Sequence, residues 1–334
     1  MDPLTQGALG AVLPQAIAKK PNLVLGSVMG FCAGMTADLD MFIRSDQDPL
    51  LFLEYHRQFT HSFIFIPIGG FVCAILLHWL IGKRRQLTFK QSMLFCTLGY
   101  ATHALLDACT SYGTMLFWPF SDERISWSVI SIVDPLFTLP ILILAVISGV
   151  RKNRIYSWLA LIWAILYMST GMIQRDRAIE VAKVIAKNRG HELVRIDAKP
   201  SFANILVWKT IYETSDRFYV DGVRMGIASS IFVGASLPKL DLARDFPWLE
   251  PKGQQQLDIE RFRWFSDSYI AKDPSYSDRI IDIRYSILPN DISALWSIKL
   301  SPSGSKSDHI EYITNHAQIS VRFKKLLNMV LGKD

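Results

Sequence analysis

The sequence is poor in the residues and motifs that mark several common protein classes. Only 4 of its 334 residues are cysteine, and no two of these cysteines have the C-x-x-C spacing of zinc or redox motifs. Charged residues make up 20% of the chain and apolar residues 50%, a balance that excludes an intrinsically disordered protein. P-loop, G-x-G-x-x-G and nucleophile-elbow motifs are all missing, so there is no signature of a nucleotide-binding enzyme or a serine hydrolase.

Charge is scarcest in the first half of the chain. Residues 1–173 contain 12 Lys and Arg and 10 Asp and Glu, whereas residues 174–334 contain 24 and 20. This change in composition predicts two domains, 1–173 and 174–334, of which the first is apolar enough to be embedded in a bilayer.

Six hydrophobic segments fill the first domain. They are residues 4–18, 22–37, 63–82, 92–110, 129–149 and 155–173. As a helix, the third is long enough to cross about 30 Å of hydrocarbon. The first two run to only about fifteen residues and could instead be re-entrant or buried against their neighbours. The sequence therefore predicts a polytopic helical membrane domain of about six segments, followed by a soluble α+β domain.

Lysine and arginine in the loops indicate how these segments are oriented. Nine of the 12 basic residues in this half follow the first, third and fifth segments. By the positive-inside rule those three loops lie in the cytoplasm, so both termini and residues 174–334 are predicted to be extracytoplasmic. The net charge of +6 and the pI near 9.1 then follow largely from topology, and no nucleic-acid partner is expected.

Acidic residues and histidines gather on the predicted outer side. They lie at the outer end of the second segment, in the loop before the third, and near the outer end of the fourth. The six residues are Asp38, Asp40, His56, His61, His103 and Asp107. Charges near the hydrocarbon are costly and are usually functional, so this joint placement predicts one site where four segments converge.

These residue types point to metal chemistry. Imidazole nitrogens and carboxylate oxygens are common zinc ligands, and they also suit manganese and iron. His103 and Asp107 are four residues apart and share one face of a helix, while a carboxylate of Asp38 or Asp40 can bridge two ions about 3.5–4 Å apart. The pattern predicts one or two divalent ions, with zinc preferred. All six residues are expected to be ligands, and Asp38, Asp40 and His61 are expected to be catalytic.

Each of these pairs, taken alone, has a simpler explanation. A single His-x-x-x-Asp can be a hydrogen-bonded pair between helices, Asp38 and Asp40 can cap a helix, and His56 can be a solvated loop residue. Asp134, which precedes a proline, is expected to cap a helix rather than to bind metal. His78 has no acidic partner in its segment and is expected to be structural.

Two arginines on the outer side are candidates for binding substrate. Arg57 follows His56 directly, and Arg124 lies in the loop after the fourth segment. A planar guanidinium can hold a phosphate through two parallel hydrogen bonds. For Arg124 an anchor at the membrane interface is an equal alternative, because Trp118 and Trp127 lie near it in the sequence.

The second domain carries weaker signals. The expected helices are residues 174–190, 259–269 and 309–331. The expected strands are residues 192–196, 205–212, 218–223, 279–287 and 294–299, with loops at 236–256 and 301–308. This pattern predicts an antiparallel or mixed sheet. The histidines of this domain, His191, His309 and His316, have no metal-ligand spacing.

Several phrases of the first domain resemble one known family. They are DPLTQGALGAVL, ADLDMF, HRQFTHS, HALLDACTSYGT, WPFSDERISW and DPLFTLP. Together they resemble the YdjM-like inner-membrane metal-dependent hydrolases over residues 1–175. The resemblance implies that the six residues above are the motif positions, that the protein lies in the bacterial inner membrane, and that it is distantly like zinc-dependent phospholipase C and S1/P1 nucleases. No further histidine ligand is evident after Asp107, which leaves the number of metal ions open.

The sequence thus predicts a membrane-embedded, metal-dependent hydrolase that cleaves a phosphate ester at the outer membrane face. A lipid partner is expected, either a phospholipid or a lipid-linked phosphate, because head groups lie at that interface. Two alternatives stay open: a transporter whose acids carry protons or metal ions, and a membrane assembly or binding protein with a structural metal. The sequence carries no signal for the oligomeric state.

Overall fold

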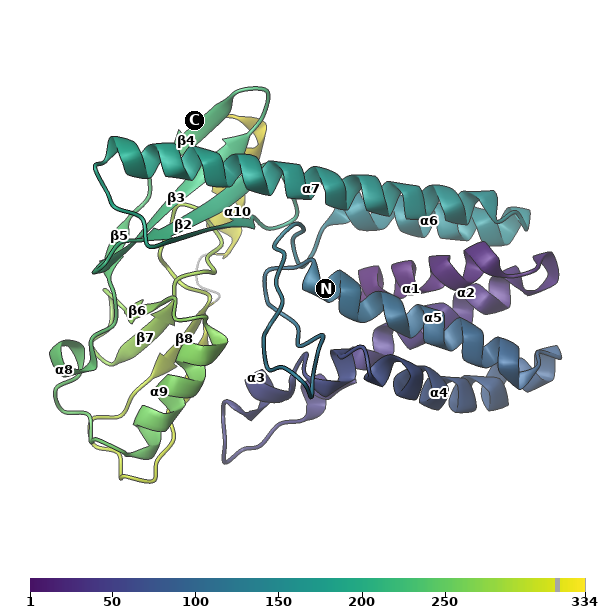
Figure 1. Ribbon diagram of the computed structural model, residues 1–334, viewed down its shortest axis with the longest axis horizontal. Helices are drawn as coiled ribbons and strands as arrows, with labels where there is room; N and C mark the ends of the chain where they lie inside the picture. The colour runs from purple at the N-terminus through teal and green to yellow at the C-terminus, as the bar shows by residue number, and fades with distance from the viewer. Residues whose placement is uncertain (316–318, 334) are drawn as a thin grey trace. The chain divides into compact units, whose positions relative to one another are not determined.

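The computed structural model describes residues 1–315 and 319–333, so His316 lies outside the described residues. The chain forms two compact units, which Figure 1 draws as ribbons. The helical unit comprises Met1–Phe42, Tyr55–Ile173 and Phe202–Asn204. The sheet unit comprises Ile43–Glu54, Gln174–Ser201 and Ile205–Asp334. Two short pieces, Ile43–Glu54 and Phe202–Asn204, thus belong to a different unit from the residues around them.

The helical unit is built from apolar helices joined by short turns. Its longer helices are α1 (Pro3–Ile17), α2 (Leu23–Thr36), α4 (Phe65–Leu77), α5 (Phe89–Ala108), α6 (Pro135–Arg151) and the first part of α7 (Ile155–Asn188). Its short helical turns are η1 (Lys20–Asn22), η2 (Ala37–Phe42), η3 (Phe59–His61), η4 (His78–Gly82) and η5 (Lys83–Arg85), and α3 (Leu51–Tyr55) begins in the sheet unit. Asp2 and Asp134 cap helices that start with proline, and Thr88 starts α5 with a capping box.

Glycines let α1, α2 and α5 pack backbone against backbone. A Cβ atom added at Gly10 of α1 would lie 2.6 Å from the carbonyl oxygen of Gly30 in α2. One added at Gly99 of α5 would lie 2.6 Å from the Cα atom of the same Gly30. Small residues of this kind are typical of helix contacts within membranes. The close approach brings together the ends of α2 and α5 that carry the predicted metal ligands.

Three helical stretches are long and apolar enough to cross a membrane among the residues that the structure describes. They are Lys20–Phe42, Phe65–Arg85 and Ile155–Asn188. The apolar helix α6 has 17 residues and α1 has 15, which is short for a span of about 20 residues. Each of the six predicted segments contains a helix, but passage of all six through the bilayer stays a prediction.

The structure changes two boundaries predicted for the helical unit. Helix α6 begins at Pro135 rather than at residue 129, because residues 129 and 130 hydrogen-bond through their backbone N–H groups to Cys109 instead. The predicted segment 155–173 and the predicted helix 174–190 form a single helix, α7, which passes from one unit into the other. No proline occurs within α7 to interrupt its backbone hydrogen bonds.

The sheet unit contains two antiparallel sheets (Figure 1). The first has the order β1-β2-β3-β4, with β5 also paired to β3, and the second has the order β6-β7-β8-β9. The strands are β1 (Arg195–Pro200), β2 (Val207–Glu213), β3 (Arg217–Met225), β4 (Ser229–Phe232), β5 (Ser236–Pro238), β6 (Ile270–Lys272), β7 (Arg279–Asp282), β8 (Trp296–Lys299) and β9 (Glu311–Thr314). The helices are the second part of α7, α8 (Leu242–Asp245), α9 (Gln254–Phe265) and α10 (Ile319–Leu331). Of the two predicted sheet types, the antiparallel one is confirmed.

Several local predictions for the sheet unit are wrong. The strand expected at 279–287 ends at Asp282, because the side chain of Arg284 turns back to pair with Asp282 at 2.7 Å. The helix expected at 309–331 starts only at Ile319, because Glu311–Thr314 pair with β8 as a strand. The loop expected at 236–256 contains β5, α8 and the first residues of α9, which runs from 254 to 265 instead of 259 to 269. Strand partners distant in sequence, which a local pattern does not reveal, account for β5 and β9.

Candidate metal centre

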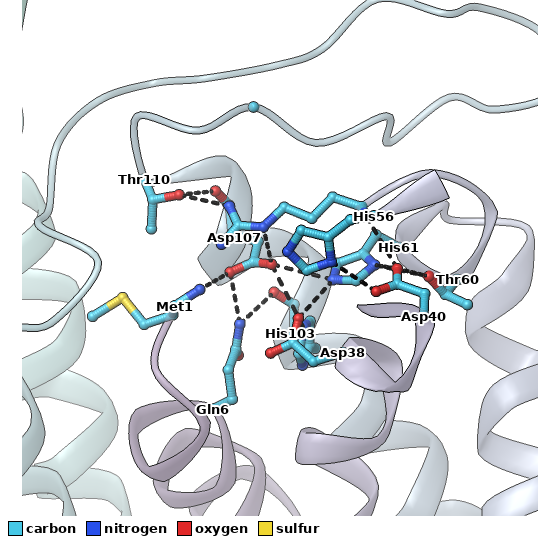
Figure 2. A network of polar contacts seen from close by, with 12 residues as sticks. Met1, Gln6, Asp38, Asp40, His56, Thr60, His61, His103, Asp107 and Thr110 are labelled. Atoms are coloured by element: carbon cyan, nitrogen blue, oxygen red, sulfur yellow. Dashed lines mark hydrogen bonds and ion pairs between the residues drawn. The ribbon is translucent and has the colours of Figure 1, made fainter. Parts of the chain in front are cut away.

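All six predicted metal-site residues lie together in the helical unit (Figure 2). Three stretches of chain contribute them, rather than the four converging segments expected. The first, η2, carries Asp38 and Asp40; the second, around η3, carries His56 and His61; the third, the last turns of α5, carries His103 and Asp107. The sequence folds this way locally because η2 continues α2 directly and the glycine contacts hold α2 against α5.

Four of the residues point one ligand atom each toward a common centre. Oδ1 of Asp38 lies 3.5 Å from Nε2 of His61 and 3.3 Å from Nε2 of His103. Oδ2 of Asp107 lies 3.2 and 3.5 Å from the same two nitrogens. None of these four atoms makes a hydrogen bond of regular geometry, although Oδ2 of Asp107 also pairs with Arg57. His61, His103 and Asp107 are completely buried, so the group is a cluster of unsatisfied polar atoms inside the protein.

The carboxylate-to-imidazole spacing of these atoms suits ligands of one metal ion. Zinc binds nitrogen and carboxylate oxygen at about 2.0–2.1 Å, so neighbouring ligands of a regular tetrahedron lie about 3.3–3.4 Å apart. The four measured separations range from 3.2 to 3.5 Å. Because two nitrogens and two carboxylate oxygens are also the donors that zinc accepts, both the geometry and the chemistry of the four atoms fit a divalent ion.

Both histidines present Nε2 to this centre because their other ring nitrogens are engaged. Nδ1 of His103 lies 2.5 Å from the carbonyl oxygen of Gly34. Nδ1 of His61 lies 3.2 Å from Oδ2 of Asp40. A proton on each Nδ1 serves these acceptors and leaves the lone pair of each Nε2 directed at the centre. A carbonyl or carboxylate partner of this kind is typical of metal-binding histidines.

Asp40 acts here as a hub of hydrogen bonds. Besides its contact with His61, it lies 2.7 Å from Nδ1 of His56 and accepts hydrogen bonds from the backbone N–H of Arg57 at 3.0 Å and the hydroxyl of Thr60 at 2.5 Å. Both oxygens are therefore engaged. Asp40 still belongs to a second group of possible ligands with Asp38 and His56, whose ligand atoms lie within 4.8 Å of one another. Asp38 is common to both groups.

The two arginines predicted to bind substrate lie at the edge of this cluster. Arg57 is buried, with Nε 3.0 Å from Oδ2 of Asp107 and Nη1 donating to the Thr110 hydroxyl at 2.9 Å. Its backbone has a φ of 63°, a left-handed conformation that non-glycine residues seldom adopt and that is common at functional sites. Arg124 donates from Nη2 to the carbonyl oxygens of Gly113 at 3.1 Å and His56 at 3.4 Å. Arg57 thus neutralises a metal-site carboxylate, and Arg124 borders the more open side near His56.

Three residues outside the six predicted ligands complete the network. The amide of Gln6, which was not among the six predicted residues, donates to Oδ1 of Asp107 at 2.8 Å. The amino group of Met1 contacts the same oxygen, and both groups are buried. Thr60 bonds to Asp40 and lies 2.9 Å from Nδ1 of His61. Thr60 has a local signal in its place directly before His61, and Gln6 has one in its place within the phrase DPLTQG. Neither signal names a partner, and that of Gln6 lies 101 residues away.

Asp134 was expected to cap a helix and His78 to be structural, and both make contacts of that kind. Asp134 accepts a hydrogen bond from the N–H of Phe137 at the start of α6 and from the hydroxyl of Tyr167 at 2.8 Å. His78 pairs with the hydroxyl of Ser92 at 2.9 Å. Neither belongs to a group of potential metal ligands among the residues that the structure describes.

Electrostatics affect the two loop histidines in opposite directions. Burial disfavours the charged form of His61, but hydrogen bonds to Asp107, Asp38 and Asp40 outweigh burial and raise its pKa to about 10. For His56 burial dominates and lowers the pKa, with only partial compensation from Asp40. Without metal, a protonated His61 therefore balances part of the negative charge of the cluster, a role that a divalent cation can take over.

Comparison with known proteins places the chain in a family. Residues 1–178 match the family described as YdjM inner membrane protein. This match covers more than half of the 334 residues and includes the whole cluster, so the chain belongs to that family, as its motifs predicted. No curated protein and no solved structure matches the chain, and the distant likeness to phospholipase C and S1/P1 nucleases stays a prediction.

Proposed function

We propose that this member of the YdjM inner membrane protein family is a metal-dependent hydrolase that cleaves a phosphate ester of a membrane lipid. The observation that carries the proposal is the group of four converging ligand atoms on Asp38, His61, His103 and Asp107, none of which makes a hydrogen bond of regular geometry. Unsatisfied polar atoms inside a protein are costly, and one bound cation satisfies all four at once. Zinc suits this donor set best, and manganese or iron accepts the same atoms.

The second group of potential ligands suggests a second ion. Four protein ligands complete a tetrahedral site, whereas three leave a position open, as in catalytic zinc sites. Asp38, Asp40 and His56 form a group of three next to the group of four. We assign the group of four to a first ion and the group of three to a second, with the carboxylate of Asp38 shared between them.

Ions held in these groups would polarise a phosphoryl oxygen and lower the pKa of a bound water toward about 7. The side chains of the protein supply the other functions. Asp38 is 17% exposed while Asp40 and Asp107 are fully buried, so Asp38 is the carboxylate of the cluster nearest to an incoming water or substrate. We assign Oδ2 of Asp40 the task of orienting His61, while its other oxygen, beside His56, would be available to the second ion. Arg124 would bind the phosphate.

Support for a lipid substrate comes from the position of these residues along the candidate spans. Asp38 and Asp40 lie in the last turns of Lys20–Phe42, and His61 comes shortly before Phe65–Arg85. The ends of a membrane-spanning helix lie near the lipid head groups, where the phosphate esters of lipids are found. The positions of lysine and arginine in the loops predict that the cluster lies at the outer face of the inner membrane.

Metal analysis and turnover of the full-length protein in lipid nanodiscs test the proposal. We expect about one or two equivalents of metal in the wild type, a clear loss in His103→Ala, and no loss in the matched control His78→Ala. Release of a phosphorylated head group from the nanodisc lipid should stop with a chelator and return with zinc. Unchanged metal content in His103→Ala would overturn the metal centre, and metal without turnover of phospholipid or lipid-linked phosphate would overturn the hydrolase.

One observation favours a second candidate function. A buried site with four protein ligands is typical of structural zinc, which stabilises a fold instead of catalysing a reaction. The protein would then be a membrane assembly or binding protein in which the metal holds η2, η3 and α5 together. In that case metal removal lowers the thermal unfolding temperature, while the metal-loaded protein turns over no phosphate ester.

A further inference from the structure

The hairpin between β3 and β4 presents apolar side chains to the surroundings. Ile227 at its tip is fully exposed, and Ile231 and Val233 farther along the chain are exposed by 49% and 71%. Single exposed aliphatic side chains are ordinary on protein surfaces. Ile231 pairs with Val223 within the sheet and Val233 follows β4, so Ile227 alone stands at the tip. The position of that tip decides what Ile227 can contact.

Hydrogen bonds tie the hairpin to α7 just beyond the apolar part of that helix. The side chain of Gln174 donates to the carbonyl oxygen of Met225 at 2.8 Å, and Arg177 donates to that of Gly226 at 2.9 Å. Gln174 follows directly on the hydrophobic stretch of the candidate span Ile155–Asn188. The hairpin tip is therefore level with the point on α7 where hydrocarbon gives way to head groups.

The register of the first sheet supports the same placement. Pro200 at the end of β1 pairs with Trp208, and Val207 at the start of β2 pairs with Arg224 of β3. The loop between β1 and β2 and the β3–β4 tip thus lie at the same end of the sheet. The end of the sheet that carries the β3–β4 tip is therefore the end bonded to α7 through Gln174 and Arg177.

We propose that the β3–β4 hairpin tip, with Ile227 at its apex, inserts into the interfacial layer of the bilayer beside α7. Insertion removes an exposed aliphatic side chain from water and adds a second attachment of the sheet unit to the membrane. The proposal rests on α7 crossing the membrane. It is independent of the metal centre and of the hydrolase activity, so an experiment can contradict one proposal without contradicting the other.

The test uses an environment-sensitive fluorescent amino acid, encoded at one position at a time in the full-length protein in lipid nanodiscs. Its quenching by lipids brominated near the head-group end of the acyl chains is measured at position 227. Position 194 is the matched control, because Val194 is also an exposed aliphatic residue, 62% exposed, and it bonds to Glu213 at the opposite end of the same sheet. That end is roughly 20–25 Å away, at about 3.3 Å per strand residue. Position 165, an exposed residue in the apolar part of α7, reports whether α7 is in the bilayer.

At least twofold stronger quenching at position 227 than at 194, together with quenching at 165, is the expected result. Quenching at 165 but not at 227 overturns the proposal while leaving α7 as a span. Equal quenching at 227 and 194 also overturns it, because the sheet would then lie along the surface instead of touching it with its tip. Absence of quenching at 165 removes α7 from the bilayer and overturns the proposal with it. Metal content, measured in parallel, is expected to be the same in all three variants.

Discussion

Two clusters of carboxylates and histidines in this protein look alike but are balanced differently. In the sheet unit, Asp258 lies 2.9 Å from Nδ1 of His309 and accepts a hydrogen bond from Arg261 at 3.0 Å, and Arg261 also pairs with Asp48 and Glu54. In the helical unit, arginine reaches only one oxygen of Asp107 within the group of four ligand atoms. The difference is visible in the buried polar atoms without partners, which include all four ligand atoms of the helical unit and no atom of Asp258, Arg261 or His309.

This contrast teaches what separates a structural ion-pair network from a candidate metal site. Where the side-chain atoms of a cluster are all hydrogen-bonded to one another, none is left to bind a cation. Where histidine nitrogens and carboxylate oxygens converge without partners, a cation supplies the missing charge and bonds together. An acidic residue near a histidine in the sequence therefore says little until its other partners are known.

The largest expected effect is on metal content, when one histidine is replaced in each cluster. We expect His61→Ala to abolish stoichiometric metal binding, an effect greater than the roughly 10–100-fold loss that follows removal of an outer partner. His309→Ala should leave the metal content unchanged, because neither His309 nor Asp258 belongs to a group of potential metal ligands among the described residues. Elemental analysis of both purified variants makes the measurement, and equal metal loss in the two would break the comparison.

The second effect is on stability and concerns the sheet unit. Arg284 and Asp282 are both buried, with two oxygens of Asp282 bonded to the guanidinium. Arg284→Met leaves a buried carboxylate unpaired and should lower the unfolding free energy by about 3–5 kcal/mol, without changing the metal content. Denaturant unfolding monitored by hydrogen exchange in β7 would show this. The double variant with Asp282→Leu should recover most of the loss; failure to recover would show that packing, not charge, is responsible.

A smaller change in metal affinity should follow from weakening the hydrogen bonds of Asp40. Asp40→Asn keeps the shape of the side chain but removes the charge that holds His61, and we expect metal affinity to fall by about 10–100-fold. A competition titration with a metal indicator measures it. Asp134→Asn is the control, because asparagine also caps a helix and Asp134 lies outside both ligand groups. An affinity unchanged by Asp40→Asn would contradict the orienting role.

The smallest effect is a dependence on pH. In the metal-free protein the pKa of His61 is about 10, so this histidine is protonated at neutral pH, whereas a metal binds the neutral imidazole. Binding should therefore release a proton, and apparent affinity should rise about tenfold between pH 7 and pH 8. Calorimetric titrations in buffers of different ionisation enthalpy count the released protons. Metal uptake with no proton release at pH 7 would show that His61 is already neutral.

Much of the candidate site could be predicted because its signals are local. The His-x-x-x-Asp spacing on α5 and the Asp-x-Asp of η2 are each short patterns with a direct geometric meaning. Patterns of this kind do not reveal partners. Gln6 and Arg57 both bond to Asp107 from distant parts of the chain, so Arg57 was expected to face a substrate and Gln6 was not among the six predicted ligands. In the sheet unit, β9 was expected to be helical because its pairing with β8 is invisible in its own residues.

The sequence by itself determined the apolar segments, the family and the set of residues that meet at the centre, because hydrophobicity and short spacings are properties of neighbouring residues. Only the tertiary structure decided how those residues are oriented and which partners each of them has. It directs Nε2 of both histidines inward, engages both oxygens of Asp40 elsewhere, and leaves Asp38 as the member common to both ligand groups. Which atoms remain without a partner depends on every group packed around them, and the fold alone brings those groups together.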